Sequence, residues 1–470
     1  MKRTLLWGFL FMALISYGQQ IALKKGGIND HLVANDSLAE TYSLFLPSNF
    51  ESKGTWPLVM VLDLKGNGRQ AMRLLLDSAE REGYLLATPN AITDTLKLTD
   101  NVLAVDRVMD KLFGMLPVDK QHIYLAGFGT SARFATLVPA FIKNIKGVVS
   151  CGAGIANQDV LSAKRPFHFM GIIGNGDFNY MSMREYGSIL DRLKHPNNML
   201  VFEGGHQWPT PEYLTKALQV FKLSSMAKGE QAFDSTYVQK TYKGNLNQVN
   251  EFMSNGNPLL AISHLKEMEK IYRPLREVDS LREYGKTIRR TLQFREQNRK
   301  QKTLFLKESL TQEDYSYYLE EDIITYNFNN LGWWNHQMNE LGKLIKSGNV
   351  QEQRMGMRLK GYLEALVADN VDLISKEKKP DFEALNFLWM LQTILNPKEY
   401  APYMKVISHS AKMEDYGTAL FYLEEMLKNG FADKKKLYEM KDTALFRITP
   451  EFNELVEKYL KGARYEPIEE

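Results

Sequence analysis

Residues 122–132 read HIYLAGFGTSA, an apolar run that stops at Gly127 and passes directly into a helical pattern. Short apolar runs rich in β-branched and aromatic residues are typical of buried strands. A strand that turns sharply into a helix through small residues presents the turn at one edge of its sheet. The turn between Gly127 and Ser131 is therefore the first candidate for a functional site.

Similar apolar runs recur through the first half of the chain, and helical patterns separate them. The predicted strands are 41–47, 58–63, 83–88, 122–127, 146–151, 168–174 and 198–204. The predicted helices are 69–81, 100–116, 131–143, 182–193 and 211–223. Continuous apolar runs that alternate with helices indicate an α/β fold, with a mainly parallel sheet and helices on both faces.

The composition excludes several classes of protein. The chain has 470 residues, more than one hydrophobic core usually supports, so two or three domains are expected. Its 59 basic and 56 acidic side chains nearly cancel, which gives no electrostatic reason to expect nucleic acid as a partner. The single cysteine, Cys151, excludes an internal disulfide framework. No His or Cys spacing predicts a metal site, and no cofactor is expected.

The N-terminal residues have the pattern of a secretory signal. Lys2 and Arg3 precede an apolar run over residues 5–15, and Gly18 is a small residue at a suitable cleavage point. The run is shorter than the roughly 20 residues that span a bilayer. We therefore expect residues 1–18 to be removed and the protein to be exported, either periplasmic or secreted, with no membrane span left.

Three segments in chain order resemble the α/β-hydrolases, and in particular esterases of the polyhydroxybutyrate depolymerase and feruloyl esterase type. IYLAGF, before the turn, is similar to the strand that leads into the nucleophile elbow of that family. IIGNGDFNY places Asp177 where the family has its triad acid, and VFEGGHQWP places His206 where it has its histidine. The resemblance covers about residues 39–223 and implies an α/β-hydrolase-like domain over 19–223.

The elbow itself departs from the family. The catalytic serine is expected two residues after Gly127, and this chain has Gly129 there. Glycine has no side chain that could attack a carbonyl, so His206 and Asp177 would have no hydroxyl to activate. The resemblance therefore implies a hydrolase fold in which the usual chemistry is lost.

Other interpretations of these residues stay open. Ser131 would be an alternative nucleophile in a shifted turn, although its position also suits a helix N-cap or first-turn residue. Thr130 is a candidate for the same role or for binding a ligand. Asp177 is also placed to cap the turn that follows it, and His206 to pack as a loop histidine beside Trp208.

The cleft beside the turn has further candidate binding residues. Gly66 and Gly68 lie where the family has its oxyanion loop, and glycine lets backbone N–H groups approach a ligand oxygen. The same glycines also fit an ordinary loop before a helix. Trp208 is a candidate to line the cleft, which without a nucleophile would still hold an ester or a carbohydrate.

From residue 224 the strand pattern stops and helical periods take over. GNPLLAISHLKEMEKIY from Gly256 and DYGTALFYLEEMLKNGF from Asp415 share a turn residue, an Ala and then Leu and aromatic positions at helical spacing. They resemble tetratricopeptide-type helical hairpins. We therefore expect an all-α, TPR-like helical-repeat domain over 224–470, which would bind a protein partner.

The sequence thus predicts an exported binding or scaffold protein built on a catalytically degenerate hydrolase fold. Two alternatives stay open. One is an active carboxylic-ester hydrolase that uses Ser131, and the other is a carbohydrate- or polymer-binding protein that uses the former active-site cleft.

Overall fold

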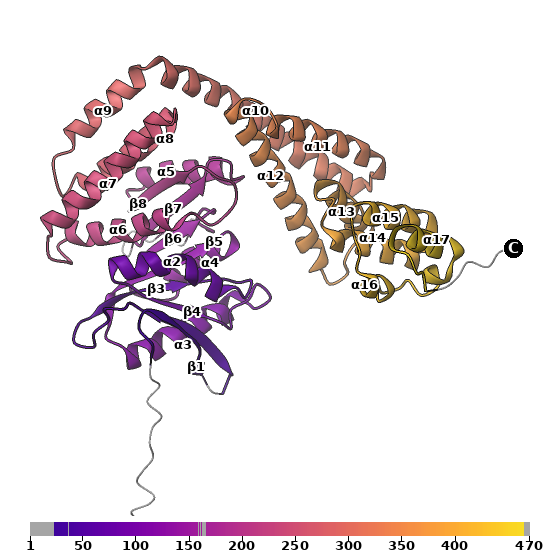
Figure 1. The fold of residues 1–470 in the computed structure, drawn as a ribbon, viewed down its shortest axis with the longest axis horizontal. Helices are drawn as coiled ribbons and strands as arrows, with labels where there is room; N and C mark the ends of the chain where they lie inside the picture. The colour runs from indigo at the N-terminus through magenta and orange to yellow at the C-terminus, as the bar shows by residue number, and fades with distance from the viewer. Residues whose placement is uncertain (1–22, 36, 158, 160, 162–165, 465–470) are drawn as a thin grey trace, which may run out of the picture.

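The computed structural model describes residues 23–35, 37–157, 159, 161 and 166–464. The predicted secretory signal at 1–18 lies outside these residues. In the described part, a sheet with helices on both faces is followed by a long run of helices that extends away from it (Figure 1). The predicted fold class, an α/β-hydrolase-like sheet followed by an all-α region, is confirmed.

The described residues form a single sheet of eight strands in the order β1-β2-β4-β3-β5-β6-β7-β8. The strands are β1 (Gly27–Asn35), β2 (Glu40–Leu46), β3 (Trp56–Val61), β4 (Leu85–Pro89), β5 (Val118–Phe128), β6 (Ile145–Cys151), β7 (His168–Gly174) and β8 (Asn197–Phe202). β2 runs antiparallel to β1 and β4, and the other neighbours are parallel. Each predicted strand is found. β1 was not predicted, because its polar sequence GINDHLVAN contains no apolar run.

Helices cover both faces of this sheet in the described chain. α2 (Gly68–Glu82) and α6 (Pro211–Ala227) share a buried apolar cluster on one face. α3 (Leu98–Met115), α4 (Thr130–Leu137) and α5 (Tyr180–Arg192) share a second cluster on the other face. Because the central strands are buried on both sides, their sequences are continuous apolar runs rather than alternating ones.

Helices make up the described chain from α7 onward. They are α7 (Ser235–Ser254), α8 (Pro258–Tyr272), α9 (Asp279–Arg290), α10 (Leu292–Thr325), α11 (Leu331–Ile345), α12 (Val350–Ser375), α13 (Phe382–Leu395), α14 (Tyr400–Lys412), α15 (Tyr416–Lys428), α16 (Lys434–Tyr438) and α17 (Pro450–Leu460). α7 and α8 pack beside the sheet, α10 runs outward, and α11 to α17 surround a separate apolar core (Figure 1). The predicted all-α region is confirmed, and its TPR-like character stays a prediction.

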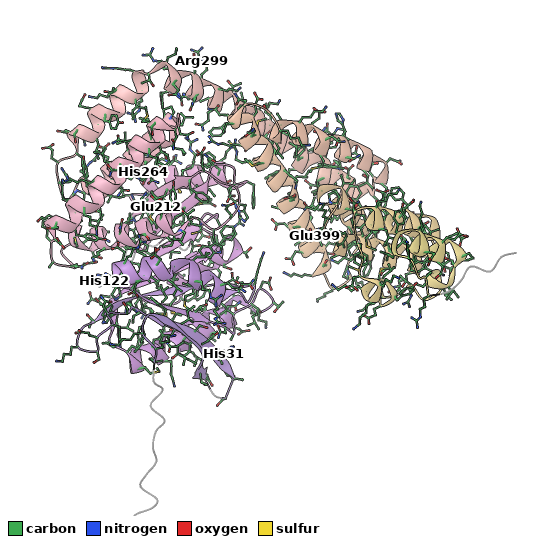
Figure 2. All side chains as sticks on the ribbon, viewed as in Figure 1. His31, His122, Glu212, His264, Arg299 and Glu399 are labelled. Carbon is green, nitrogen blue, oxygen red and sulfur yellow. The ribbon has the colours of Figure 1, made fainter. Side chains whose placement is uncertain are left out.

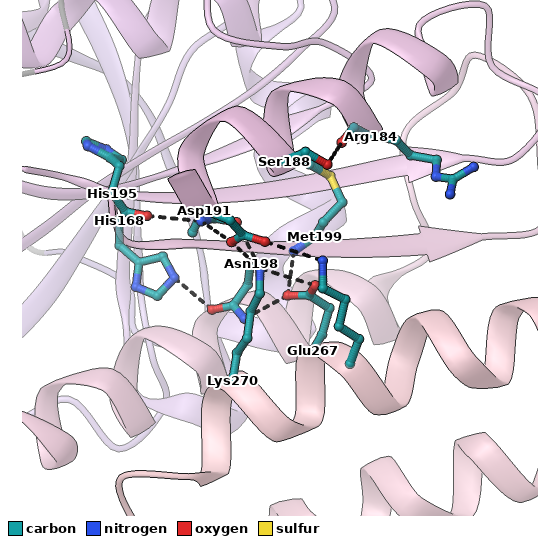
Figure 3. Close-up of polar contacts among 11 residues, drawn as sticks. His168, Arg184, Ser188, Asp191, His195, Asn198, Met199, Glu267 and Lys270 are labelled. Atoms are coloured by element: carbon teal, nitrogen blue, oxygen red, sulfur yellow. Dashed lines mark hydrogen bonds and ion pairs between the residues drawn. The ribbon is translucent and has the colours of Figure 1, made fainter. Parts of the chain in front are cut away.

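α8 covers the edge of the sheet at β8 (Figure 3). The buried carboxylate of Glu267 accepts hydrogen bonds from the Asn198 amide and from the backbone N–H of Met199, at 2.9 and 3.0 Å. An uncovered edge strand would offer its backbone N–H groups to other chains, so this contact protects the sheet. The predicted boundary between residues 223 and 224 falls inside α6, and whether either part folds alone stays a prediction.

His168 and His264 are buried near this junction. His168 Nε2 lies 2.9 Å from Asn198 Oδ1, and His264 Nε2 lies 2.9 Å from Asn245 Oδ1 of α7. Figure 2 shows His264 on α8, among the helices beside the sheet. Burial lowers the pKa of His168 to about 4 and that of His264 to about 3. Both side chains therefore stay neutral in the folded protein at pH values where an unfolded histidine is already protonated.

We expect the protein to lose stability as the pH falls from about 6.5 toward 4. In that window the unfolded histidines bind protons and the folded ones do not, so each contributes a slope of up to about 1.4 kcal/mol per pH unit. His264→Gln removes one of these titrations and should flatten the dependence of the urea midpoint on pH. His31→Gln is the control, because that side chain is 81% exposed. A dependence as steep in His264→Gln as in the parent would contradict the prediction.

Candidate functional site

A sharp turn joins β5 to α4 at the carboxyl edge of the sheet. A Cβ at Gly127 would lie 2.7 Å from the Ser131 carbonyl, so only glycine allows the two segments to pass this closely. Gly129 lies between strand and helix with φ 54° and ψ −123°, a conformation that residues with a Cβ rarely adopt. Its N–H donates to the carbonyl of Cys151, at the end of β6, over 2.9 Å. The local backbone therefore follows the strand-to-helix course of a nucleophile elbow.

His206 and Asp177 meet beside this turn. His206 Nδ1 is 2.9 Å from Asp177 Oδ2, and the other carboxylate oxygen accepts the backbone N–H of Asn179 at 2.8 Å. The Asp177 side chain is 1% exposed, whereas that of His206 is 33% exposed. Asp177 therefore caps its own turn and orients the imidazole at the same time, so the two roles considered for it from the sequence are compatible.

The other ring nitrogen of His206 faces position 129. A Cβ built on Gly129 would lie 3.5 Å from His206 Nε2 and 3.9 Å from His206 Cε1, with no other heavy atom closer. A side chain at this position would therefore point at the imidazole without a clash. The structure thus brings Gly129, Asp177 and His206 together in the relative positions of a catalytic triad that lacks its hydroxyl.

Aromatic rings fix the orientation of this imidazole. The ring centroids of Phe128 and Phe178 each lie 4.6 Å from that of His206. Trp208 stacks on Phe128 with centroids 5.6 Å apart, so this predicted cleft residue belongs to the same cluster. Phe128 and Phe178 were not predicted as site residues, although they are the direct sequence neighbours of Gly129 and Asp177.

Ser131 has a different environment from the one that a nucleophile needs. The residue is 4% exposed, and its hydroxyl accepts the backbone N–H of Leu64 at 2.9 Å. In the described part of the chain, the side-chain hydrogen bond of His206 goes to Asp177 and not to Ser131. Thr130 is exposed at the first position of α4. This geometry does not favour Ser131 as an alternative nucleophile, and it supports the first-turn structural role.

The loop after β3 uses its backbone donors internally. The N–H of Leu64 donates to Ser131, as described above. The N–H groups of Lys65 and Asn67 both donate to the Asp63 carboxylate, at 2.9 and 3.0 Å. Three donors of the predicted oxyanion loop are therefore already engaged by side chains of the protein itself.

Gly66 and Gly68, the predicted binding glycines, have structural roles in this loop. Gly66 has φ 76°, which lets the loop turn where a side chain would be strained. Gly68 is the first residue of α2, and a Cβ there would collide with the Thr88 hydroxyl. Any additional role of these glycines in binding a ligand stays a prediction.

α12 holds the loop that carries Asp177. Arg358 donates to the carbonyl of Asn175 at 2.7 Å and forms a bidentate ion pair with Glu308 of α10, at distances from 2.6 to 3.1 Å. Both charged side chains are buried, at 4% and 0% exposure. A Cβ at Gly361, one turn further along α12, would lie 3.1 Å from the Phe178 ring. The sequence did not predict these contacts, because 50 and 183 residues separate Arg358 from its two partners.

Other reactive features of the described residues are limited. They contain no group of three or more His, Cys, Asp or Glu side chains that could hold a metal ion. Cys151 is buried, and burial raises the pKa of its thiol, so the reactive thiolate is disfavoured. Among the same residues, every helix is too short or too polar to cross a membrane.

Comparisons with known proteins give similarity in structure only. No protein-family model matches the sequence, and no curated protein gives a significant match. S-formylglutathione hydrolase from Staphylococcus aureus is 13% identical, with a TM-score of 0.33, over 42% of this chain and 98% of its own. An esterase from Pyrobaculum calidifontis is 11% identical, with a TM-score of 0.35, over 43% of this chain and 86% of its own. The feruloyl esterase module from Clostridium thermocellum is 14% identical, with a TM-score of 0.34, over 41% of this chain and 86% of its own.

The α/β-hydrolase fold of the N-terminal part is evident in the chain itself. The strand order β1-β2-β4-β3-β5-β6-β7-β8 is that of the α/β-hydrolase fold. As in that fold, β2 is the one strand of the described sheet that runs antiparallel to the others. The turn at Gly129 follows β5, Asp177 follows β7 and His206 follows β8, in the chain order that this fold requires.

Ser131→Ala should lower the free energy of unfolding by about 1–3 kcal/mol, because the buried Leu64 N–H loses its acceptor. The measurement is urea-induced unfolding followed by circular dichroism. Ser52→Ala, at an exposed serine, is the matched control. Equal stability of the two variants would mean that the Ser131 hydroxyl is not committed to this contact.

Glu308→Ala should destabilise the protein by about 3–5 kcal/mol, because it leaves the Arg358 guanidinium buried without its counter-charge. A double variant, Glu308→Leu with Arg358→Met, should recover part of that loss because both charges are gone. Glu320→Ala, an exposed carboxylate on the same helix, is the control. The measurement is the urea midpoint of unfolding of each variant. A loss of stability in Glu308→Ala no larger than that in Glu320→Ala would contradict the prediction.

Proposed function

We propose that this chain is an exported protein with an α/β-hydrolase fold that has lost ester hydrolysis and acts by binding. The observation that carries the proposal is the geometry at position 129. An imidazole oriented by Asp177 faces a residue that has no side chain, so a general base is present without a nucleophile. Loss of a triad member costs several orders of magnitude in rate.

The loop after β3 supports the same proposal. Hydrolases of this fold take one oxyanion donor from such a loop, and one donor is worth ~3 kcal/mol of transition-state stabilisation. Here the N–H groups of Leu64, Lys65 and Asn67 are engaged by side chains. These three donors could bind a substrate oxyanion only by giving up their present hydrogen bonds, which reduces the net gain from binding it.

A protein partner of the helical part is the second element of the proposal. α10 has five apolar side chains that are more than half exposed. One is Leu292 at its start, and the other four are Leu306, Leu310, Tyr317 and Ile324. Their spacing of four and seven residues places them along one side of the helix. Large apolar side chains grouped in solvent are typical of interaction surfaces.

The alternatives differ in how the structure supports them. The structure does not support an esterase that uses Ser131, because the Ser131 hydroxyl is buried and accepts the backbone N–H of Leu64. A carbohydrate or ester ligand in the cleft has support in the Phe128 and Trp208 rings beside the partly exposed His206. Such a ligand would be bound rather than cleaved.

The mature protein should show no labelling by a fluorophosphonate probe and no hydrolysis of short-chain nitrophenyl esters. Gly129→Ser should be labelled slowly and hydrolyse these esters weakly, because its Cβ would lie within reach of His206 Nε2. Gly129→Ala controls for the backbone conformation, and adding His206→Ala to Gly129→Ser should abolish the labelling. Parent activity that disappears in both Ser131→Ala and His206→Ala would overturn the proposal.

Export has its own test, because it rests on residues outside the described part. Mass spectrometry of the exported protein should give a mature chain that begins near Gln19. An intact segment from Met1 to Gly18 would contradict the proposed export signal.

A further inference from the structure

A cavity of about 260 Å³ lies where α5, β8 and α8 meet α10 and α12. Gly129, Asp177 and His206 are not among its lining residues, so it is separate from the site described above. Figure 3 shows part of its wall, with Arg184 and Ser188 on α5, Met199 on β8, and Glu267 and Lys270 on α8. Cavities between two parts of a chain are frequent binding sites for small ligands.

The wall of this cavity has more cationic side chains than carboxylates. It contains one carboxylate, Glu267, and six cationic side chains, Arg184, Lys266, Lys270, Arg289, Arg354 and Arg358. Four of these cations already have carboxylate partners: Lys266 and Lys270 pair with Asp191 at 3.3 and 2.7 Å, Arg354 pairs with Glu203, and Arg358 pairs with Glu308. In the described residues no carboxylate lies within ion-pair distance of Arg184 or Arg289, so positive charge is left over at the cavity.

Two buried polar atoms of the lining residues lack partners. Asn175 is 5% exposed, and its side-chain Nδ2 has no hydrogen-bond partner in the described structure. Oε1 of Gln351 is also buried and unpartnered there. Both atoms are closed off from solvent, so a polar ligand in the cavity could pair with them only after the side chains turn toward it.

The apolar part of the wall lies directly beside the cations. The Arg184 guanidinium carbon is 5.6 Å from the Tyr180 ring centroid and 5.3 Å from that of Phe305. Arg358 lies at the same distances from the same two rings. Leu260 also lines the cavity. The cavity thus combines cations and aromatic side chains in one partly open space.

We propose that this cavity binds a small organic anion, a carboxylate or a phosphate monoester, with its charged group at Arg184 and Arg354 and its apolar body beside Tyr180 and Phe305. Burial lowers the pKa of Arg354 against the opposing effect of Glu203, which marks it as a poorly solvated cation. An anion would restore the interactions that this guanidinium has lost with water. The proposal does not depend on the loss of hydrolysis, because the two sites share no lining residue.

Calorimetric titration of the mature protein at low ionic strength tests this site. The probes are phenyl phosphate, benzoate, inorganic phosphate and phenol. We expect saturable binding of phenyl phosphate or benzoate, weaker binding of inorganic phosphate, and none of phenol. The tighter of the two organic anions identifies the charged group. Absence of saturable binding for both organic anions, or binding of phenol or inorganic phosphate equal to theirs, would overturn the proposal.

Variants locate the binding. Arg184→Gln and Arg289→Gln change exposed side chains that are not needed for folding, and Arg184→Gln should weaken binding by about tenfold. Arg81→Gln, an exposed cation on α2, and His206→Ala, in the other site, should leave the affinity unchanged. Affinity unaltered by Arg184→Gln and Arg289→Gln, or lost in His206→Ala, would show that the anion binds elsewhere.

Discussion

The guanidinium of Arg358 determines how the two parts of the molecule fit together. It is buried, and its donors are divided between Glu308 of α10 and the backbone carbonyl of Asn175. A buried cation is tolerated only when such partners are in place, so α10, α12 and the loop after β7 are constrained as one unit. Asp177 follows Asn175 in that loop, and the carboxylate that orients His206 is therefore held in part by the helical region.

The candidate site keeps its orientation without its nucleophile. Asp177 fixes one nitrogen of His206, Phe128 and Phe178 fix the ring, and the other nitrogen faces Gly129. Glycine also suits the left-handed backbone of the turn better than serine would, since a side chain at φ 54° carries strain of about 1–3 kcal/mol. With glycine at position 129, the turn avoids this backbone strain. The proposed binding role rests on this arrangement of Gly129, Asp177 and His206.

Much of the fold could be predicted from the sequence, because buried strands and amphipathic helices each have a characteristic spacing of apolar residues. The strand at the edge, Gly27–Asn35, was missed because its exposed face leaves no apolar run. In the site, Asp177 and His206 are predicted from the resemblance of their segments to the α/β-hydrolases, and the structure places them in contact. The contacts of Glu267 with the sheet edge and of Arg358 with the acid loop could not be predicted. Such contacts depend on three-dimensional packing between distant segments, and a lone buried charge has no sequence period.

α10 has a mechanical consequence because of its length. Its 34 residues make a rod of about 50 Å that joins the sheet part to the outer helices (Figure 1). Glu308 lies near the midpoint of this rod, where its buried ion pair with Arg358 attaches α10 to α12. A tilt of about 10° around that point would displace each end by about 4 Å. A tilt of this size would therefore move the outer helices by several ångströms relative to the sheet.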